Sequence, residues 1–94
     1  MELTGTIIEI YPSEVTRTRK TIKRFVLQVE EKWEHGSKQQ YYPIQLFEKR
    51  IKLLDGISVG DLVKVTVNVD GVRYGKPGEY RYFVNLNAWH VERG

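Results

Sequence analysis

The sequence contains no cysteine among its 94 residues, which excludes disulfides, thiol catalysis and thiolate metal sites. It also lacks any apolar run near the ~18 residues that cross a membrane, and an apolar N-terminal segment of the signal-peptide type. We therefore expect a cytoplasmic protein with no membrane partner. Charged residues make up 29% of the chain and hydrophobic residues 40%, a composition typical of globular proteins. The length predicts a single domain spanning residues 1–94.

Enzyme motifs are missing as well. The stretch GVRYGKP, residues 71–77, superficially resembles a phosphate-binding loop. However, it is one residue short, Pro77 stands where a serine or threonine must hold magnesium, and a strand rather than a helix is predicted after it. His35 and His90 belong to no metal-ligand spacing, and no paired carboxylates or Ser-His-Asp arrangement stands out. We therefore expect no enzymatic activity, no metal and no cofactor.

Positive charge is concentrated in one stretch, EVTRTRKTIKRF, residues 14–25. Its one acid is Glu14, its three threonines are poor helix formers, and no glutamate lies four residues before a lysine or arginine inside it. The stretch is therefore predicted as a loop leading into a strand, not as a solvated helix face. The net charge of the chain is only +3, but charge gathered in one patch can form a phosphate-binding surface. The basic residues of the stretch are Arg17, Arg19, Lys20, Lys23 and Arg24.

Alternation of apolar and polar residues dominates the rest of the chain and predicts five strands. Gly5 and the doublet Ile7-Ile8 predict a bulge or bend in the first strand. Between the third and fourth strands the period changes, and a short helix is predicted over residues 48–54. Turns are predicted at residues 36–38 and 59–61, and a loop at residues 70–79. The predicted strands cover residues 3–11, 22–31, 39–47, 63–69 and 80–91.

Five strands with one short helix between the third and fourth are the element order of an OB-fold. We therefore predict an all-β, five-stranded Greek-key barrel of this class. An SH3-like barrel is the alternative, but it normally lacks a helix at that point. The ligand face of an OB-fold is formed by the second and third strands, flanked by the loops between strands one and two and between strands four and five.

Both of those flanking loops are basic, and one of them also carries an aromatic residue. The second loop contains Arg73, Tyr74 and Lys76. Single-strand-binding proteins combine a positive groove for the backbone with aromatic rings on which bases stack. The aromatic candidates are Trp33, Tyr41, Phe47 and Tyr74, and the alternative for each is ordinary packing. Phe83 and Trp89 are interpreted as mainly structural.

Two stretches resemble the bacterial single-stranded-DNA-binding proteins. YYPIQLFEKRIKLL, residues 41–54, is similar to the third strand and the start of the helix in that family, and VGDLVKVTVNV, residues 59–69, follows its layout. The resemblance implies that the family's base-stacking aromatics fall on Trp33, Tyr41, Phe47 and Tyr74. Two of the four are tyrosine here. The sequence stops at WHVERG, without the acidic tail that recruits partner proteins in the family, so we expect either that this role is absent or that the tail has been trimmed. The chain also resembles an uncharacterised family of small bacterial and phage OB-fold domains.

From these features we predict non-specific binding of single-stranded DNA that supports replication, recombination or repair. The alternative is a protein-interaction module that uses the same face without nucleic acid. The sequence leaves the choice between DNA and RNA open. We also predict a homo-oligomer, a dimer or tetramer, because the edge of the first strand has little chain to cover it and the last strand carries Phe83, Trp89 and Val91 on a second apolar face.

Overall fold

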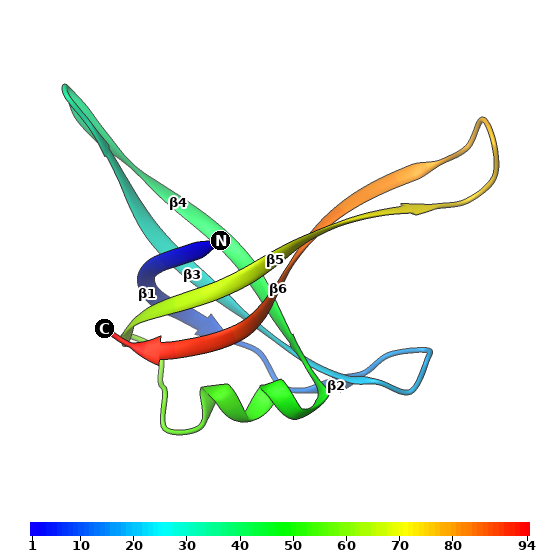
Figure 1. Ribbon diagram of the computed structural model, residues 1–94, viewed down its shortest axis with the longest axis horizontal. Helices are drawn as coiled ribbons and strands as arrows, with labels where there is room; N and C mark the ends of the chain where they lie inside the picture. The colour runs from blue at the N-terminus through cyan, green and yellow to red at the C-terminus, as the bar shows by residue number, and fades with distance from the viewer.

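The computed structural model describes residues 1–94 and contains six strands and one short helix (Figure 1). Five strands follow the predicted order, and the sixth is a two-residue strand inside the basic stretch. The helix is neither long nor apolar enough to cross a membrane. The elements are β1 (Glu2–Ile10), β2 (Glu14–Val15), β3 (Thr21–Trp33), β4 (Gly36–Phe47), the 3₁₀-helix η1 (Glu48–Leu54), β5 (Leu62–Tyr74) and β6 (Arg81–Arg93).

The strands close into a barrel because β1 pairs with two neighbours. Residues 2–6 of β1 pair with β5, and residues 6–10 pair with β3. The strand order is β1-β5-β6-β4-β3-β2, and the additional pairing of β1 with β3 closes the five long strands into a barrel, with β2 outside the closure. All pairings are antiparallel except the one between β4 and β6. This arrangement confirms the predicted OB-fold.

The bend in β1 depends on the residues that the sequence singled out. A Cβ atom at Gly5 would lie 2.2 Å from the carbonyl oxygen of Gln28 on β3, so only glycine allows the two strands to approach this closely. The pairing between β1 and β3 then shifts by one residue between Ile7 and Glu9. This bulge lets β1 turn from β5 toward β3, as predicted.

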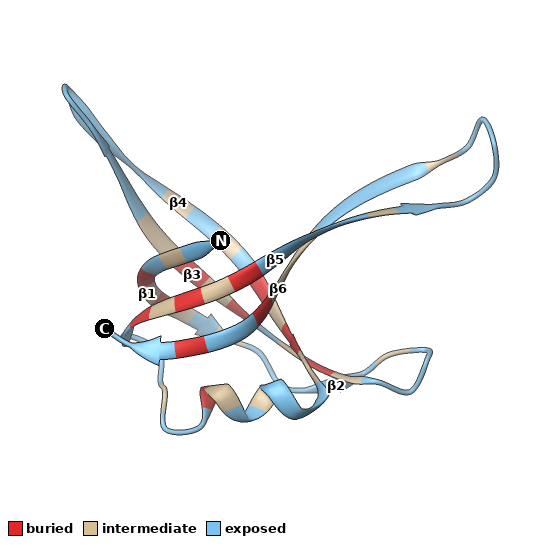
Figure 2. Ribbon diagram, in the orientation of Figure 1, coloured by how far each residue is buried: buried red, intermediate tan, exposed pale blue.

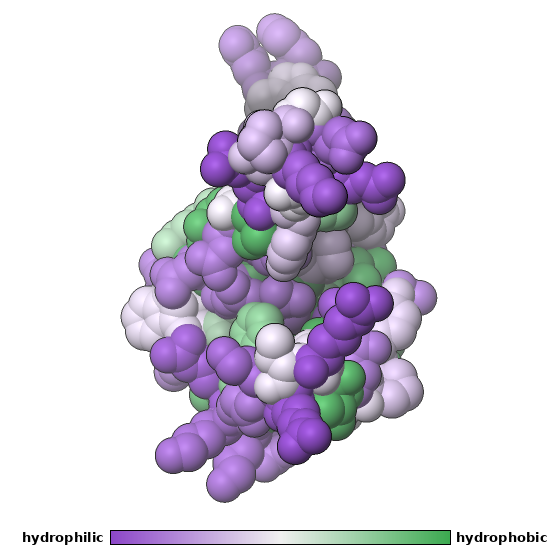
Figure 3. All heavy atoms as spheres, turned by 90° about the vertical axis from the view of Figure 1, so that its right-hand side faces the viewer, coloured by the Kyte–Doolittle hydropathy of each residue, from purple (hydrophilic) through white to green (hydrophobic).

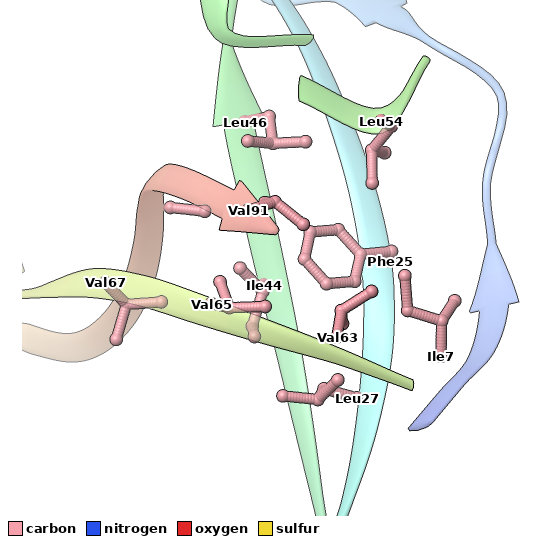
Figure 4. Packing of buried hydrophobic residues seen from close by; sticks show 11 residues of the cluster. Ile7, Phe25, Leu27, Ile44, Leu46, Leu54, Val63, Val65, Val67 and Val91 are labelled. Atoms are coloured by element: carbon pink, nitrogen blue, oxygen red, sulfur yellow. The ribbon is translucent and has the colours of Figure 1, made fainter. Parts of the chain in front are cut away.

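Alternate residues of the strands fill the barrel interior (Figures 2 and 4). Phe25 from β3 and Ile44 from β4 lie on directly paired positions, and both side chains are buried. The structure contains no buried polar or charged residue, so the core is held together by apolar burial alone. The core cluster consists of Ile7, Phe25, Leu27, Ile44, Leu46, Leu54, Val63, Val65, Val67, Ala88 and Val91.

The helix η1 covers one end of the barrel (Figure 1). Its bounds are those predicted, but it is a 3₁₀-helix rather than an α-helix. In the 3₁₀ geometry side chains three residues apart lie directly above one another. Ile51 and Leu54 have this spacing, and both contact the core.

Two hairpins extend well beyond the barrel (Figure 1) and are largely exposed (Figure 2). We call the part of the β3–β4 hairpin that lies outside the barrel the first arm, and the corresponding part of the β5–β6 hairpin the second arm. The first arm turns at residues 34–35, so the turn predicted at 36–38 was placed too late. The loop predicted at residues 70–79 shrinks to residues 75–80, because β5 continues to Tyr74. Pro77 and Gly78, which has a φ of 86°, form a tight turn in which the Glu79 amide donates to Lys76 at 2.8 Å.

A second bulge, in β6, changes which residues of this strand face the core, so the faces predicted by simple alternation are wrong after it. The pairing between β5 and β6 shifts so that Trp89 is an extra residue between Ala88 and His90. Val91 therefore returns to the core and is buried, although simple alternation predicted it on the outer face with Trp89. By simple alternation Val84 shares the face of Leu86, which packs against the core, but Val84 lies on the second arm and is exposed.

Candidate nucleic-acid interface

A groove of about 540 Å³ lies between the basic stretch and the second arm, with β4 between them. In Figure 1 its two walls are the hairpins on the right-hand side of the molecule. Figure 3 shows this side, where hydrophilic residues cover most of the surface and small apolar patches lie among them. Five of the side chains predicted to bind nucleic acid line the groove: Arg17, Lys20, Arg24, Phe47 and Tyr74.

The basic wall is a small hairpin and not an irregular loop. Glu14 and Val15 of β2 pair with the first two residues of β3. The turn between them is closed by the Thr16 amide, which donates to the Lys20 carbonyl at 2.8 Å, and by the Lys20 amide, which donates to the Thr16 hydroxyl at 3.2 Å. These bonds hold the turn that presents Arg17 to the groove.

The charges on this wall are mostly unpaired. Glu14, the only acid of the stretch, forms a salt bridge with Arg24. No carboxylate lies within salt-bridge distance of Arg17 or Lys20. These two cations therefore face the groove with no partner in the protein, and the site has net positive charge.

The floor and the opposite wall supply the aromatic rings. Phe47 is paired with Ile22 across β3 and β4, and it lies half-buried on the groove side while Ile22 is buried beneath the groove. Tyr74 is 59% exposed. The sequence placed Tyr74 in a loop, but in the structure it is the last residue of β5. Its ring meets the edge of Phe83 at a centroid distance of 5.7 Å, so it is held in place and still offers a face to a ligand.

Phe83 and Trp89 were interpreted as mainly structural, and both have substantial exposed area. The contact with Tyr74 gives Phe83 a packing role at the wall of the groove. Trp89 lies on the outside of the barrel and is 47% exposed, because the bulge in β6 turns it away from the core.

Two predicted cations of the basic stretch lie outside the groove. Lys23 shares the face of Phe25 and lines a separate depression beside Ile51 and Leu54 of η1. Successive side chains of a strand point to opposite faces, so Lys23 and Arg24 separate. Arg19 occupies the turn with a positive φ of 63° and does not line the groove.

The two basic residues predicted on the second arm are also outside the groove. The guanidinium of Arg73 lies 4.1 Å from the centre of the Tyr80 ring, an arrangement that stabilises the arm through a cation–π contact. Lys76 lies in the turn that ends the arm. Both add positive charge near the groove without lining it.

The two aromatic candidates of the first arm, Tyr41 and Trp33, do not line the groove. Tyr41 lies too far along the strand, and Trp33 lies on the opposite face of the sheet. Tyr41 is exposed and lies on the same face of β4 as Phe47, six residues earlier, or about 20 Å along the strand. Trp33 lies at the end of β3 next to the turn, against Gly36, and alternation puts it on the opposite face, with Leu27.

Sequence reasoning missed the polar residues of the groove. Gln45 and Asn85 line it together with the charged and aromatic side chains. Both also line a smaller continuation of the groove between β4 and β6, which reaches Pro43 and Val84. Gln45 lies two residues before Phe47, so alternation along the strand places both on the same face, and this residue could have been found from the sequence.

Two side chains outside the groove have shifted pKa values. The pKa of Tyr11 is raised because its hydroxyl donates a hydrogen bond to the Glu9 carboxylate at 2.7 Å, and that charge opposes loss of the proton. The pKa of Lys64 is raised because the Glu2 carboxylate accepts a hydrogen bond from its ammonium group at 3.0 Å. Neither residue lines the groove.

A family model matches residues 2–92, which is almost the whole chain. The protein belongs to the family described as Domain of unknown function (DUF3127). A comparison with curated protein sequences finds no match.

Solved structures share the fold of this DUF3127 protein. One is a small single-stranded DNA-binding protein from Streptomyces coelicolor, with a TM-score of 0.68 and 14% identity over 100% of this chain and 92% of that chain. Another is the Plasmodium falciparum SSB in complex with ssDNA, with a TM-score of 0.68 and 17% identity over 98% of this chain and 88% of that chain. At these identities the likeness shows the fold alone.

Proposed function

We propose that this protein binds single-stranded DNA in the groove between the basic hairpin and the second arm. The observation that carries the proposal is the convergence of Arg17 and Lys20 with Phe47 and Tyr74 on one open surface. These residues come from separate parts of the sequence. Such binding would support DNA replication, recombination or repair, and it requires no catalytic group.

The two kinds of side chain have different tasks. Exposed cations attract the phosphate backbone regardless of sequence and make affinity fall as salt rises. Aromatic rings stack on bases, and each stack contributes roughly 1–3 kcal/mol. The cations would therefore supply the part of the affinity that salt weakens, and Phe47 and Tyr74 the part that persists at high salt.

Unpaired strands should bind better than duplex. Bases in a duplex are already stacked and paired, so their faces are not available to Phe47 or Tyr74. The structure has no α-helix that could enter a major groove. Two solved proteins with this fold are described as single-stranded-DNA-binding proteins, which supports the same ligand class.

A titration of fluorescently labelled oligothymidine at several salt concentrations tests the proposal. We expect tight binding at low salt and a log–log slope of about −0.7 for each phosphate contacted. A duplex of equal length should bind more weakly, and an oligouridine RNA decides between DNA and RNA. Equal binding of duplex and single strand, or no binding at low salt, would contradict the proposal.

We also propose that the protein forms a homo-oligomer. Residues 2–4 of β1 pair with β5 on one side and with no strand on the other, which leaves a short edge open to a second copy. Trp89 adds an exposed aromatic surface on the outside of the barrel. Val91 no longer contributes, because it is buried, and Phe83 is partly covered by Tyr74.

Sedimentation at several micromolar concentrations tests the oligomer. We expect a species larger than the 11.1 kDa chain, with the balance shifting on dilution. Trp89→Ala should weaken the association if this surface is used. A single species of monomer mass at every concentration would exclude the oligomer.

A further inference from the structure

A chain of three hydrogen-bonded polar side chains begins at Gln45 in the groove and runs across β6 to β5. The Gln45 side-chain amide donates to the side-chain oxygen of Asn87 at 2.8 Å, and the Asn87 amide donates in turn to the Asp70 carboxylate. The parallel pairing of β4 with β6 brings Gln45 and Asn87 together. Gln45 lines both the groove and its continuation between β4 and β6, so it occupies the middle of the surface along which a strand would lie.

The chemistry of these groups fixes the orientation of Gln45. An ionised carboxylate only accepts hydrogen bonds, so Asn87 must turn its NH₂ group toward Asp70. The Asn87 oxygen then faces Gln45, which must present its own NH₂ group to that oxygen. The Gln45 Oε1 atom remains, and it accepts no hydrogen bond from the protein. It is not a buried unsatisfied atom, so it is open to a ligand.

Neighbouring residues would bring a base to this oxygen. Gln45 and Phe47 lie on the same face of β4, two residues apart, and Arg24 is the residue paired with Gln45 on β3. A base that stacks on Phe47, with its phosphate near Arg24, would have an edge close to Gln45. An acceptor in that position favours a base that presents an amino group and disfavours one that presents a carbonyl oxygen.

We propose that Gln45, oriented by Asp70 through Asn87, makes the groove prefer cytosine over uracil or thymine at one nucleotide position. This inference rests on the proposed function. Cytosine carries an amino group at C4, where uracil and thymine carry a carbonyl oxygen. Gln45 is the contact residue, and Asp70 and Asn87 are positioning residues. One neutral hydrogen bond corresponds to a preference of roughly two- to tenfold.

The test compares labelled oligodeoxycytidine and oligodeoxyuridine of equal length, at one salt concentration and at mildly alkaline pH. Deoxyuridine is used because it lacks the 5-methyl group of thymidine, so the two ligands differ mainly in the donor and acceptor pattern of the base. The wild-type protein should bind the cytidine oligomer more tightly. Gln45→Met should abolish this preference, and Gln39→Met, which alters the same strand outside the groove, should preserve it.

Asp70→Asn tests the orientation itself. Asparagine can donate as well as accept, so Gln45 is no longer held in one orientation and the preference should shrink toward unity. Loss of the negative charge will strengthen binding of both oligomers equally, which leaves their ratio as the readout. Equal wild-type affinity for both oligomers would overturn the inference but leave the proposed function intact. An undiminished preference in Asp70→Asn would overturn the positioning role, and no binding of either oligomer would overturn the proposed function itself.

Discussion

Replacing Tyr74 with alanine should weaken binding of single-stranded DNA much more than it weakens the fold. The Tyr74 ring is 59% exposed and faces the groove. Loss of one base stack is worth about 1–3 kcal/mol, which corresponds to a rise of about 5- to 150-fold in Kd. The substitution removes no charge, so the salt slope should stay the same.

The cost to the fold follows from the one aromatic contact of this ring. Tyr74 meets the edge of Phe83, and an aromatic pair contributes about 0.5–1.5 kcal/mol beyond area burial. For a domain of this size, ~1 kcal/mol lowers Tm by roughly 4–8 °C. The variant should therefore remain folded at the temperature of the binding assay, with a modest fall in Tm.

Matched variants separate stacking from packing. Tyr74→Phe keeps the ring and should bind almost as well as the wild type. Tyr82→Ala removes an equally large ring that is 72% exposed on the same arm but does not line the groove, so it should leave affinity unchanged. Affinity is measured by fluorescence anisotropy and Tm by circular dichroism. Wild-type affinity in Tyr74→Ala, or an equal loss in Tyr82→Ala, would refute the assignment of the stacking face.

Two further predictions concern charge and close packing. Arg17→Ala combined with Lys20→Ala should flatten the salt dependence, by about 0.7 in slope for each phosphate that the protein no longer neutralises. Lys23→Ala is the control because it removes a charge beside the helix, and an unchanged slope in the double variant would exclude the basic hairpin from the interface. Gly5→Ala should destabilise the barrel by about 1–3 kcal/mol, because its Cβ would lie 2.2 Å from the Gln28 carbonyl oxygen. A thermal unfolding curve that matches the wild type would show that β1 and β3 can move apart there at little cost.

The barrel could be predicted from the sequence because burial alternates along its strands. Val63, Val65 and Val67 are buried, and the residues between them are not. In the arms the alternation ends, since both faces meet water, and three of the four predicted strands that enter the arms stopped short there. The backbone hydrogen bonds continue regardless of burial, and β5 therefore reaches Tyr74. Bulges also limit what the sequence can predict, because an extra residue such as Trp89 reverses the faces of every residue after it.

The segments that form the walls of the site could also be predicted from the sequence. Only some of the side chains that line those walls could be predicted. The order of the elements indicated which segments flank the groove, and this required no knowledge of side-chain direction. Selecting side chains required the faces of each strand. Lys23 lies two residues before Phe25, and Trp33 lies six residues after Leu27, so both share the face of core residues. The sequence already contained that information. The contact of Tyr74 with Phe83 joins two strands across a turn, and no local pattern indicates such a contact.

The walls of the groove are hydrogen-bonded hairpins, and this bears on how a strand of DNA would bind. Ordering a loop during binding costs free energy, and each immobilised long side chain costs a further 0.5–1.5 kcal/mol or so. Here the basic hairpin is closed by its own backbone bonds, and the second arm is supported by the contact between Tyr74 and Phe83 and by that between Arg73 and Tyr80. Only side chains then remain to be ordered, at about 0.5–1.5 kcal/mol each, while each base stack contributes about 1–3 kcal/mol. A groove with two stacking rings can therefore hold a flexible strand without first folding a loop around it.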